Sequence, residues 1–159
     1  MKQNRRTLLS TMVAAPIAMS LPLSVFAQKK IVLGFSQIGA ESEWRTANTN
    51  SIKDTAAKEG IDLKFSDAQQ KQENQIKALR SFIAQKVDVI AFAPVVESGW
   101  DTVLKEIKAA KIPVILTDRS VDSKDTSLYV TFMGSDFTEE GRKAGRWLLE
   151  CPDSSAPLR

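Results

Sequence analysis

Residues 87–117 read VDVIAFAPVVESGWDTVLKEIKAAKIPVILT, and this stretch decides the fold. A run from Val87 to Ala93 that is apolar except for Asp88 is followed by an amphipathic segment and then by a second apolar run from Pro113 to Thr117. Continuous apolar runs suit strands that are buried on both faces of a parallel sheet. The stretch therefore predicts a strand–helix–strand unit with residues 87–93 as a central strand. Between the strands, five apolar residues at helical spacing predict an amphipathic helix, with Trp100 in the core: Trp100, Val103, Leu104, Ile107 and Ala110.

The same alternation of strands and helices continues on both sides of this unit. Strands are predicted at 31–35, 61–65 and 128–133, and helices at about 42–58, at about 72–85 and after Ser135 or Asp136. The strand at 61–65 alternates apolar and polar residues, which is typical of an edge strand with one solvent-exposed face. The last helix has a capping-box spacing between Asp136 and Glu139. We expect it to bury one apolar side, made of Phe137, Gly141, Ala144 and Leu148.

Five strands and four helices in this order predict an α/β fold with a doubly wound parallel sheet. The commonest strand order for such a unit is 2-1-3-4-5. In that order a crevice opens at the carboxyl ends of the first and third strands, with the fourth strand alongside. We therefore expect site residues just after Phe35, Ala93 and Thr117.

The first 27 residues predict an export signal that is cleaved. Three basic residues precede an uncharged run from Leu8 to Val25, and Val25-Phe26-Ala27 fits a signal peptidase site before Gln28. A membrane anchor is the alternative, but Pro16 and Pro22 interrupt the apolar run. The pair Arg5-Arg6 is compatible with twin-arginine export as well as with the Sec route. Either route predicts a periplasmic location.

Removal of this leader changes the charge balance of the chain. The whole sequence has 22 basic and 19 acidic residues; three of the basic residues lie in the leader and all the acidic residues follow it. The remaining 132 residues therefore carry 19 charges of each sign. A neutral domain argues against nucleic acid as a partner. This length is enough for one domain with a core, but not for two of ordinary size.

The sequence lacks the residues that most enzymes and metal sites use. It has no histidine and a single cysteine, Cys151, which leaves no metal cluster and no Cys–His pair. It has no G-x-G-x-x-G after the first strand, no G-x-x-x-x-G-K and no nucleophile elbow. We therefore expect a binding protein rather than an enzyme, with no catalytic residues, no metal and no cofactor.

Polar side chains follow the three strands that should meet at the crevice, in segments 36–45, 94–100 and 118–120. Carboxylates and guanidinium groups that lie close together can satisfy the vicinal hydroxyls of a sugar with charge-assisted hydrogen bonds. An aromatic ring such as Trp44 can cover the apolar C–H face of the same sugar. The most specific of these features is a pair of oppositely charged residues, Asp118 and Arg119, at the end of a buried strand.

Each of these residues also has a purely structural explanation. Asp118 can begin a turn while Arg119 is solvated, and the pattern leaves this explanation and the functional one equally open. Glu41 and Arg45 stand four residues apart at the start of a helix, where the pattern favours an ion pair. Trp44 can pack against the sheet as a core residue.

Four segments together resemble a known family: VLGFSQ at 32–37, ESEWR at 41–45, QQKQENQI at 69–76 and TDRS at 117–120. They resemble the galactofuranose binders among the ribose- and galactose-type sugar-binding proteins of ABC transporters, over residues 31 to about 149. The resemblance implies a periplasmic protein that binds a monosaccharide without changing it chemically and delivers it to a permease. It implies ligand hydrogen bonds from Glu41, Arg45, Asp118 and Arg119, with Ser36, Gln37 and Trp44 as neighbours.

The resemblance also predicts how the chain is organised. Members of this family have two similar lobes joined by three crossings, and they trap sugar when the lobes close. Residues 28–151 would then be an N-terminal sugar-binding lobe of the type I periplasmic binding protein fold. The resemblance also predicts that the protein is a monomer. Residues 152–159 would be a crossover that is truncated before the second lobe. Two alternatives stay open: the effector-sensing core of a sugar-responsive regulator, and a nonfunctional truncated remnant.

Overall fold

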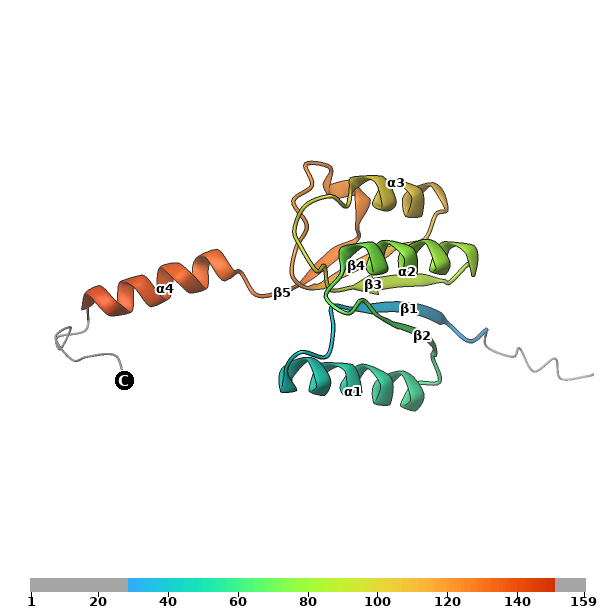
Figure 1. Cartoon of the computed structure of the whole chain (residues 1–159), viewed down its shortest axis with the longest axis horizontal. Helices are drawn as coiled ribbons and strands as arrows, with labels where there is room; N and C mark the ends of the chain where they lie inside the picture. Colours follow the sequence, from blue (N-terminus) through green and yellow to red (C-terminus); the bar gives the residue numbers. More distant parts are fainter. Residues whose placement is uncertain (1–28, 151–159) are drawn as a thin grey trace, which may run out of the picture.

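The computed structural model describes residues 29–150 and places a five-stranded parallel sheet at the centre of the molecule (Figure 1). The strand order is β2-β1-β3-β4-β5, which confirms the predicted doubly wound α/β fold, with β3 at the centre and β2 at an edge. The predicted leader at 1–27 and the predicted crossover at 152–159 lie outside the described residues. The strands are β1 (Val32–Gln37), β2 (Asp62–Asp67), β3 (Val89–Phe92), β4 (Val114–Asp118) and β5 (Thr131–Gly134). The helices are α1 (Glu43–Lys58), α2 (Gln72–Ala84), α3 (Asp101–Ala109) and α4 (Phe137–Glu150), with a 3₁₀ turn η1 (Thr126–Leu128).

One face of the sheet is covered by α2 and α3. Because side chains alternate across a strand, every second residue of β3 and β4 faces these helices. These residues form the core together with the apolar stripes of the two helices. Trp100 is only 2 % exposed, and its ring centroid lies 5.1 Å from that of Phe92, so its predicted place in the core is confirmed. The sheet residues of this core are Ile90, Phe92, Val114 and Leu116.

The opposite face is covered only in part. Helix α1 lies over the β2 side, where the rings of Phe35 and Phe65 stack with centroids 6.1 Å apart. Lys53 of α1 lies 4.4 Å from the centroid of the Phe65 ring, within reach of a cation–π contact. Beyond α1 the apolar residues of this face are less buried, and Met133 of β5 is 62 % exposed.

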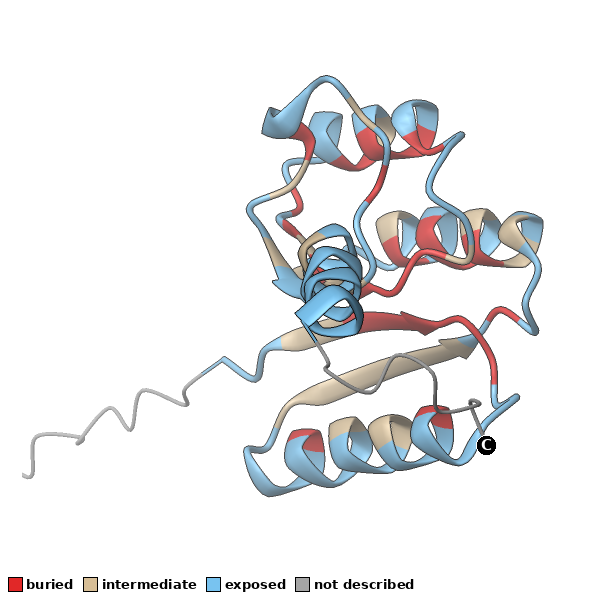
Figure 2. Cartoon of the chain, turned by 90° about the vertical axis from the view of Figure 1, so that its left-hand side faces the viewer, coloured by how far each residue is buried: buried red, intermediate tan, exposed pale blue. Residues whose placement is uncertain are grey.

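Helix α4 projects away from the sheet (Figure 1). Its amino end is capped as the sequence predicted, since Oδ1 of Asp136 accepts a hydrogen bond of 2.9 Å from the backbone N–H of Glu139. The prediction that α4 buries an apolar side was wrong, because no residue of this helix is buried (Figure 2). The link from β5 carries α4 beyond the carboxyl edge, so its apolar side does not meet the sheet. Within residues 29–150, neither α4 nor any other helix has the length and apolar composition of a membrane span.

The close packing of β1 against α2 leaves no room for a side chain at Gly34. A Cβ there would lie 2.6 Å from Cγ of Phe82, whose ring is almost fully buried. We expect Gly34→Ala to lower the free energy of unfolding by about 1–3 kcal/mol, because overpacking forces the core to shift. In a Phe82→Ala background, which lacks Cγ and the ring, the same Gly34→Ala change should cost less. Urea denaturation followed by circular dichroism measures both effects, and an unchanged midpoint for Gly34→Ala would contradict this packing.

Candidate functional site

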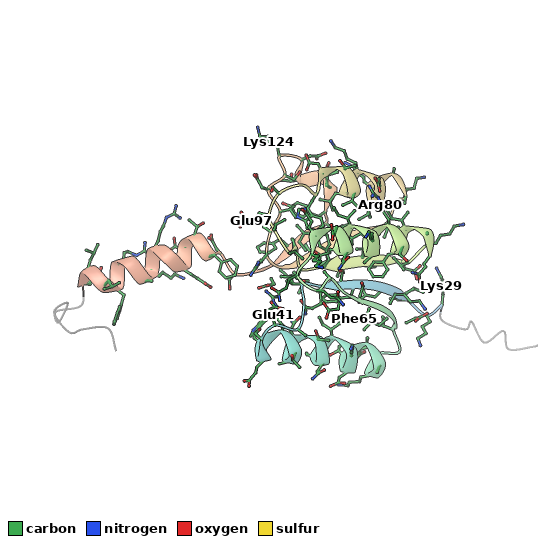
Figure 3. All side chains as sticks on the ribbon, in the orientation of Figure 1. Lys29, Glu41, Phe65, Arg80, Glu97 and Lys124 are labelled. Atoms are coloured by element: carbon green, nitrogen blue, oxygen red, sulfur yellow. The ribbon has the colours of Figure 1, made fainter. Side chains whose placement is uncertain are left out.

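The carboxyl ends of the strands meet at the end of the molecule from which α4 projects. Figure 3 shows Glu41 and Glu97 at this end and Lys29 at the opposite end. Ligands of open parallel sheets bind at this edge, where the loops after neighbouring strands converge. Here the loops after β1, β3 and β4 bring together the polar segments that the sequence singled out.

Arg45 occupies the centre of a charged cluster at this edge. It lies in the first turn of α1, where Ser42 caps the helix by accepting a 3.2 Å hydrogen bond from the backbone N–H of Arg45. Its Nε donates to Oε1 of Glu41 at 3.1 Å, and its Nη1 donates to Oδ2 of Asp118 at 2.6 Å. The residue is 6 % exposed. The ion pair expected between Glu41 and Arg45 is therefore confirmed, and it forms half of a larger network that reaches β4.

Asp118 ends β4 in a strained turn. Its φ is 64°, and the backbone N–H of Arg119 donates to the carbonyl oxygen of Thr117 at 2.7 Å. This hydrogen bond between residues two apart, with positive φ at the middle residue, is the rare and strained form of γ-turn. In the turn, the Asp118 carboxylate reaches Arg45 through Oδ2, while its Oδ1 has no hydrogen-bond partner within residues 29–150. One carboxylate oxygen thus remains available as an acceptor at the edge of the sheet.

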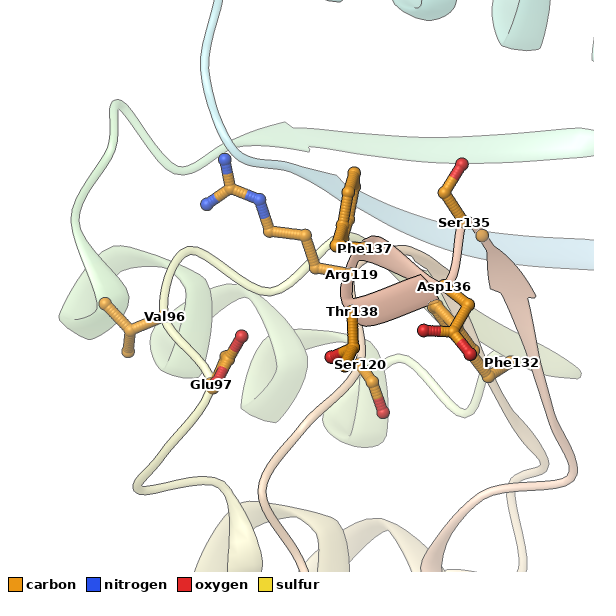
Figure 4. Close-up of a pocket in the computed structure, with 10 residues that line it drawn as sticks. Val96, Glu97, Arg119, Ser120, Phe132, Ser135, Asp136, Phe137 and Thr138 are labelled. Atoms are coloured by element: carbon orange, nitrogen blue, oxygen red, sulfur yellow. The ribbon is translucent and has the colours of Figure 1, made fainter. Parts of the chain in front are cut away.

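Arg119 connects this cluster to an open cavity of about 610 Å³ (Figure 4). Its Nε lies 4.0 Å from Oδ2 of Asp118, and its Nη1 donates to the carbonyl oxygen of Val95 at 3.4 Å. Side chains from the loops after β3, β4 and β5 surround the cavity, whose volume is in the range of small-molecule sites. Six of the lining residues are Val96, Glu97, Ser120, Ser135, Asp136 and Phe137.

Trp44 lies at the surface beside the charged cluster. It is 55 % exposed, so the alternative that it packs in the core was wrong. The guanidinium carbon of Arg45 lies 4.8 Å from the centroid of the Trp44 ring, within the distance of a cation–π contact. The structure therefore brings five of the predicted site residues together at one edge: Glu41, Trp44, Arg45, Asp118 and Arg119. Their role in ligand binding stays a prediction.

Ser36 and Gln37 lie beneath this edge rather than on it. Both residues are fully buried at the end of β1. The Gln37 side-chain amide donates to Oδ1 of Asn48 at 2.9 Å and accepts from the backbone N–H of Ile38 at 3.0 Å. The hydroxyl of Ser36 has no hydrogen-bond partner in the described part of the chain. In this structure, neither side chain is exposed at the surface of the site.

Gln75 of α2 supports the site, and the sequence reasoning did not single it out. Its side chain is fully buried, and its Nε2 donates to the carbonyl oxygens of Ala93 at 2.8 Å and Ser36 at 3.3 Å. Its Oε1 accepts from the backbone N–H of Val95 at 3.0 Å. One amide therefore holds the carboxyl ends of β1 and β3 together. A glutamine on the apolar side of an amphipathic helix, one residue before Ile76, was the available signal.

Replacing Gln75 by leucine should destabilise the chain markedly. The change removes the donor to the buried carbonyl oxygen of Ala93 and the acceptor for the backbone N–H of Val95, so we expect a loss of about 1–3 kcal/mol in the free energy of unfolding. Gln85→Leu is the matched control, because Gln85 is exposed and, among residues 29–150, its side-chain amide bonds only to the hydroxyl of Ser81. Urea titration of both variants makes the comparison. Equal losses in the two variants would show that the Gln75 amide has no special role.

The fold and this edge define the class of protein. The chain is an α/β lobe whose parallel sheet presents a fixed cluster of carboxylates and guanidinium groups, next to an open cavity, at the position where such sheets bind ligands. The family described as periplasmic binding protein domain matches residues 33–155, and the chain belongs to this family of non-enzymatic binding proteins. This match confirms the family of the resemblance noted in the sequence.

Several characterised relatives bind sugars. The chain is 52 % identical over 149 residues to the galactofuranose-binding protein YtfQ of Escherichia coli, a match that covers 92 % of this chain and 44 % of that protein. Among solved structures, a Mycobacterium smegmatis protein in complex with β-D-fucofuranose is 61 % identical with a TM-score of 0.73, covering 80 % of this chain and 41 % of that one. A Shewanella arabinose-transporter binding protein with bound L-arabinofuranose is also 61 % identical, with a TM-score of 0.70 and coverage of 75 % and 39 %. The chain therefore spans less than half the length of these relatives.

Proposed function

We propose that the chain is one lobe of an exported periplasmic binding protein that recognises a furanose sugar for an ABC transporter. The observation that carries this proposal is the network in which Arg45 joins Glu41 to Asp118 at the carboxyl edge of the sheet. Relatives named for galactofuranose, or solved with fucofuranose and arabinofuranose, support the sugar class. Residues 1–27 would direct export by the Sec or twin-arginine route, and a permease would receive the sugar.

The proposed binding mode follows from the atoms that the network leaves available. Oδ1 of Asp118 accepts a hydrogen bond from one sugar hydroxyl, and the partly exposed guanidinium of Arg119 donates to the neighbouring hydroxyl. Because Arg45 already holds both carboxylates, little side-chain freedom is lost when the sugar binds. The exposed ring of Trp44 covers the apolar C–H face of the sugar.

A site built on one lobe leaves much of a monosaccharide in contact with water. Tight small-molecule sites bury most of the ligand surface, so the free energy gained from one side alone is small. We therefore expect a dissociation constant of roughly 1 mM for this chain, far weaker than for a sugar enclosed on all sides.

Two glycosides with locked rings test the sugar class. Methyl β-D-galactofuranoside should shift the indole N–H signal of Trp44 in a two-dimensional NMR titration, and methyl β-D-galactopyranoside should shift it much less. Asp118→Asn should weaken furanoside binding about tenfold or more, because it removes a charge-assisted hydrogen bond.

Glu106→Gln is the matched control for the loss of a carboxylate. Glu106 pairs with Arg80 on the outer surface of α2 and α3, where both oxygens accept hydrogen bonds of 2.8 Å. This variant should bind the furanoside as the unmodified chain does. Equal affinity in Asp118→Asn and the unmodified chain would exclude the proposed site, and equal responses to the two glycosides would exclude the furanose preference.

A further inference from the structure

The side of α1 that faces the sheet is polar at the end of the helix that carries the site. Residues three and four apart lie on the same side of a helix, and this side carries Arg45, Asn48, Thr49, Ile52 and Ala56. A helix that covers a sheet normally packs through an apolar stripe, which here is confined to Ile52 and Ala56 in the second half. Arg45 is buried, and Asn48 and Thr49 are half-buried. The position of the first two turns therefore depends on hydrogen bonds.

Gln37, at the end of β1, supplies hydrogen bonds to this polar side. The residue is 1 % exposed, and its Nε2 donates to Oδ1 of Asn48 at 2.9 Å and to Oγ1 of Thr49 at 3.3 Å. Its Oε1 accepts from the backbone N–H of Ile38 at 3.0 Å, which fixes the direction in which the amide points. Backbone pairing of β1 with β2 holds Gln37 itself in place. One buried amide thus ties the second turn of α1 to the sheet.

Arg45 lies one turn before these two acceptors, on the same side of α1. Its nearest partners cannot fix the helix relative to the sheet, because Glu41 directly precedes α1 and Ser42 caps it, so both move with the helix. Within residues 29–150, side chains of α1 form hydrogen bonds to the sheet in two places, at Gln37 and at Asp118. The Gln37 bonds therefore set the height and rotation at which α1 presents the guanidinium to Asp118.

We propose that Gln37 is a positioning residue, which sets α1 so that the guanidinium of Arg45 meets Asp118, without touching a ligand itself. A buried amide whose donor and acceptor atoms are both bonded within the chain has nothing to offer a sugar. The strained turn at Asp118 persists only while its contacts hold it, and Arg45 is one of them. The consequence for sugar binding rests on the proposed function: loss of the Gln37 amide should weaken binding by displacing Arg45.

NMR of the arginine side chain tests the proposal in the chain without ligand. The Nε–H signal of Arg45, identified by its loss in Arg45→Lys, should exchange slowly with water, because the group is buried and bonded to Glu41. Gln37→Met keeps the length of the side chain and removes the amide, and Asn48→Leu removes the acceptor on α1. In each variant this proton should exchange about fivefold faster or more, because a hydrogen bond that holds α1 in place is lost.

Two control variants separate positioning from a general loss of stability. Asn50→Leu makes the same chemical change as Asn48→Leu, at an exposed position on the outer side of α1. Ile107→Val removes one methylene group from the core on the other face of the sheet. Neither control should change the exchange of the Arg45 proton. Circular dichroism verifies folding, and the half-buried position of Asn48 keeps the test available if Gln37→Met does not fold.

Unchanged exchange in Asn48→Leu overturns the proposal, and so does an equal rise in Asn50→Leu or Ile107→Val. Titration with methyl β-D-galactofuranoside then distinguishes this inference from the proposed function. Faster exchange with weaker binding in Gln37→Met and Asn48→Leu supports both. Faster exchange with unchanged affinity overturns the role of Gln37 at the site. Faster exchange in these variants, when the unmodified chain binds no furanoside, supports the positioning of Arg45 by Gln37 and contradicts the proposed function.

Discussion

The buried guanidinium of Arg45 is the contact on which the site depends. It joins the first turn of α1 to the end of β4, two segments 73 residues apart in the sequence. A buried ion pair is weak evidence for stability, since desolvation of the charges offsets much of their attraction, whereas loss of one partner leaves an uncompensated charge. The contribution of Arg45 is therefore chiefly geometric. It fixes two carboxylates at the edge of the sheet and leaves Oδ1 of Asp118 without a hydrogen-bond partner within residues 29–150.

Two other features hold the charged side chains in place at this edge. The strained turn at Asp118 places its carboxylate within 2.6 Å of Arg45, and the buried amide of Gln75 holds the ends of β1 and β3 in register beneath it. Backbone strain at such a position persists only where the surrounding contacts hold it in place. Here those contacts are the ion pair on one side and the parallel pairing of β4 on the other. A rigid donor and acceptor set suits a protein that binds a ligand without changing it.

The two faces of the sheet differ in how far they are covered. The face toward α2 and α3 is a closed core that holds the strands in position, while the opposite face ends in an apolar groove. Helix α4 has an apolar side that nothing in residues 29–150 covers.

The sequence by itself determined the elements and their order. Apolar runs such as 87–93, helical spacing around Trp100 and the cap at Asp136 are local signals, and each depends on residues a few positions apart. The carboxyl-edge position of the charged residues followed from the strand order alone. Only the tertiary structure decided that Arg45 pairs with Asp118 as well as Glu41, that Ser36 and Gln37 lie buried, and that α4 leaves the sheet. Each of these three features depends on whether segments that are distant in the sequence contact one another. A local pattern of polar and apolar residues does not specify which surface another segment will contact.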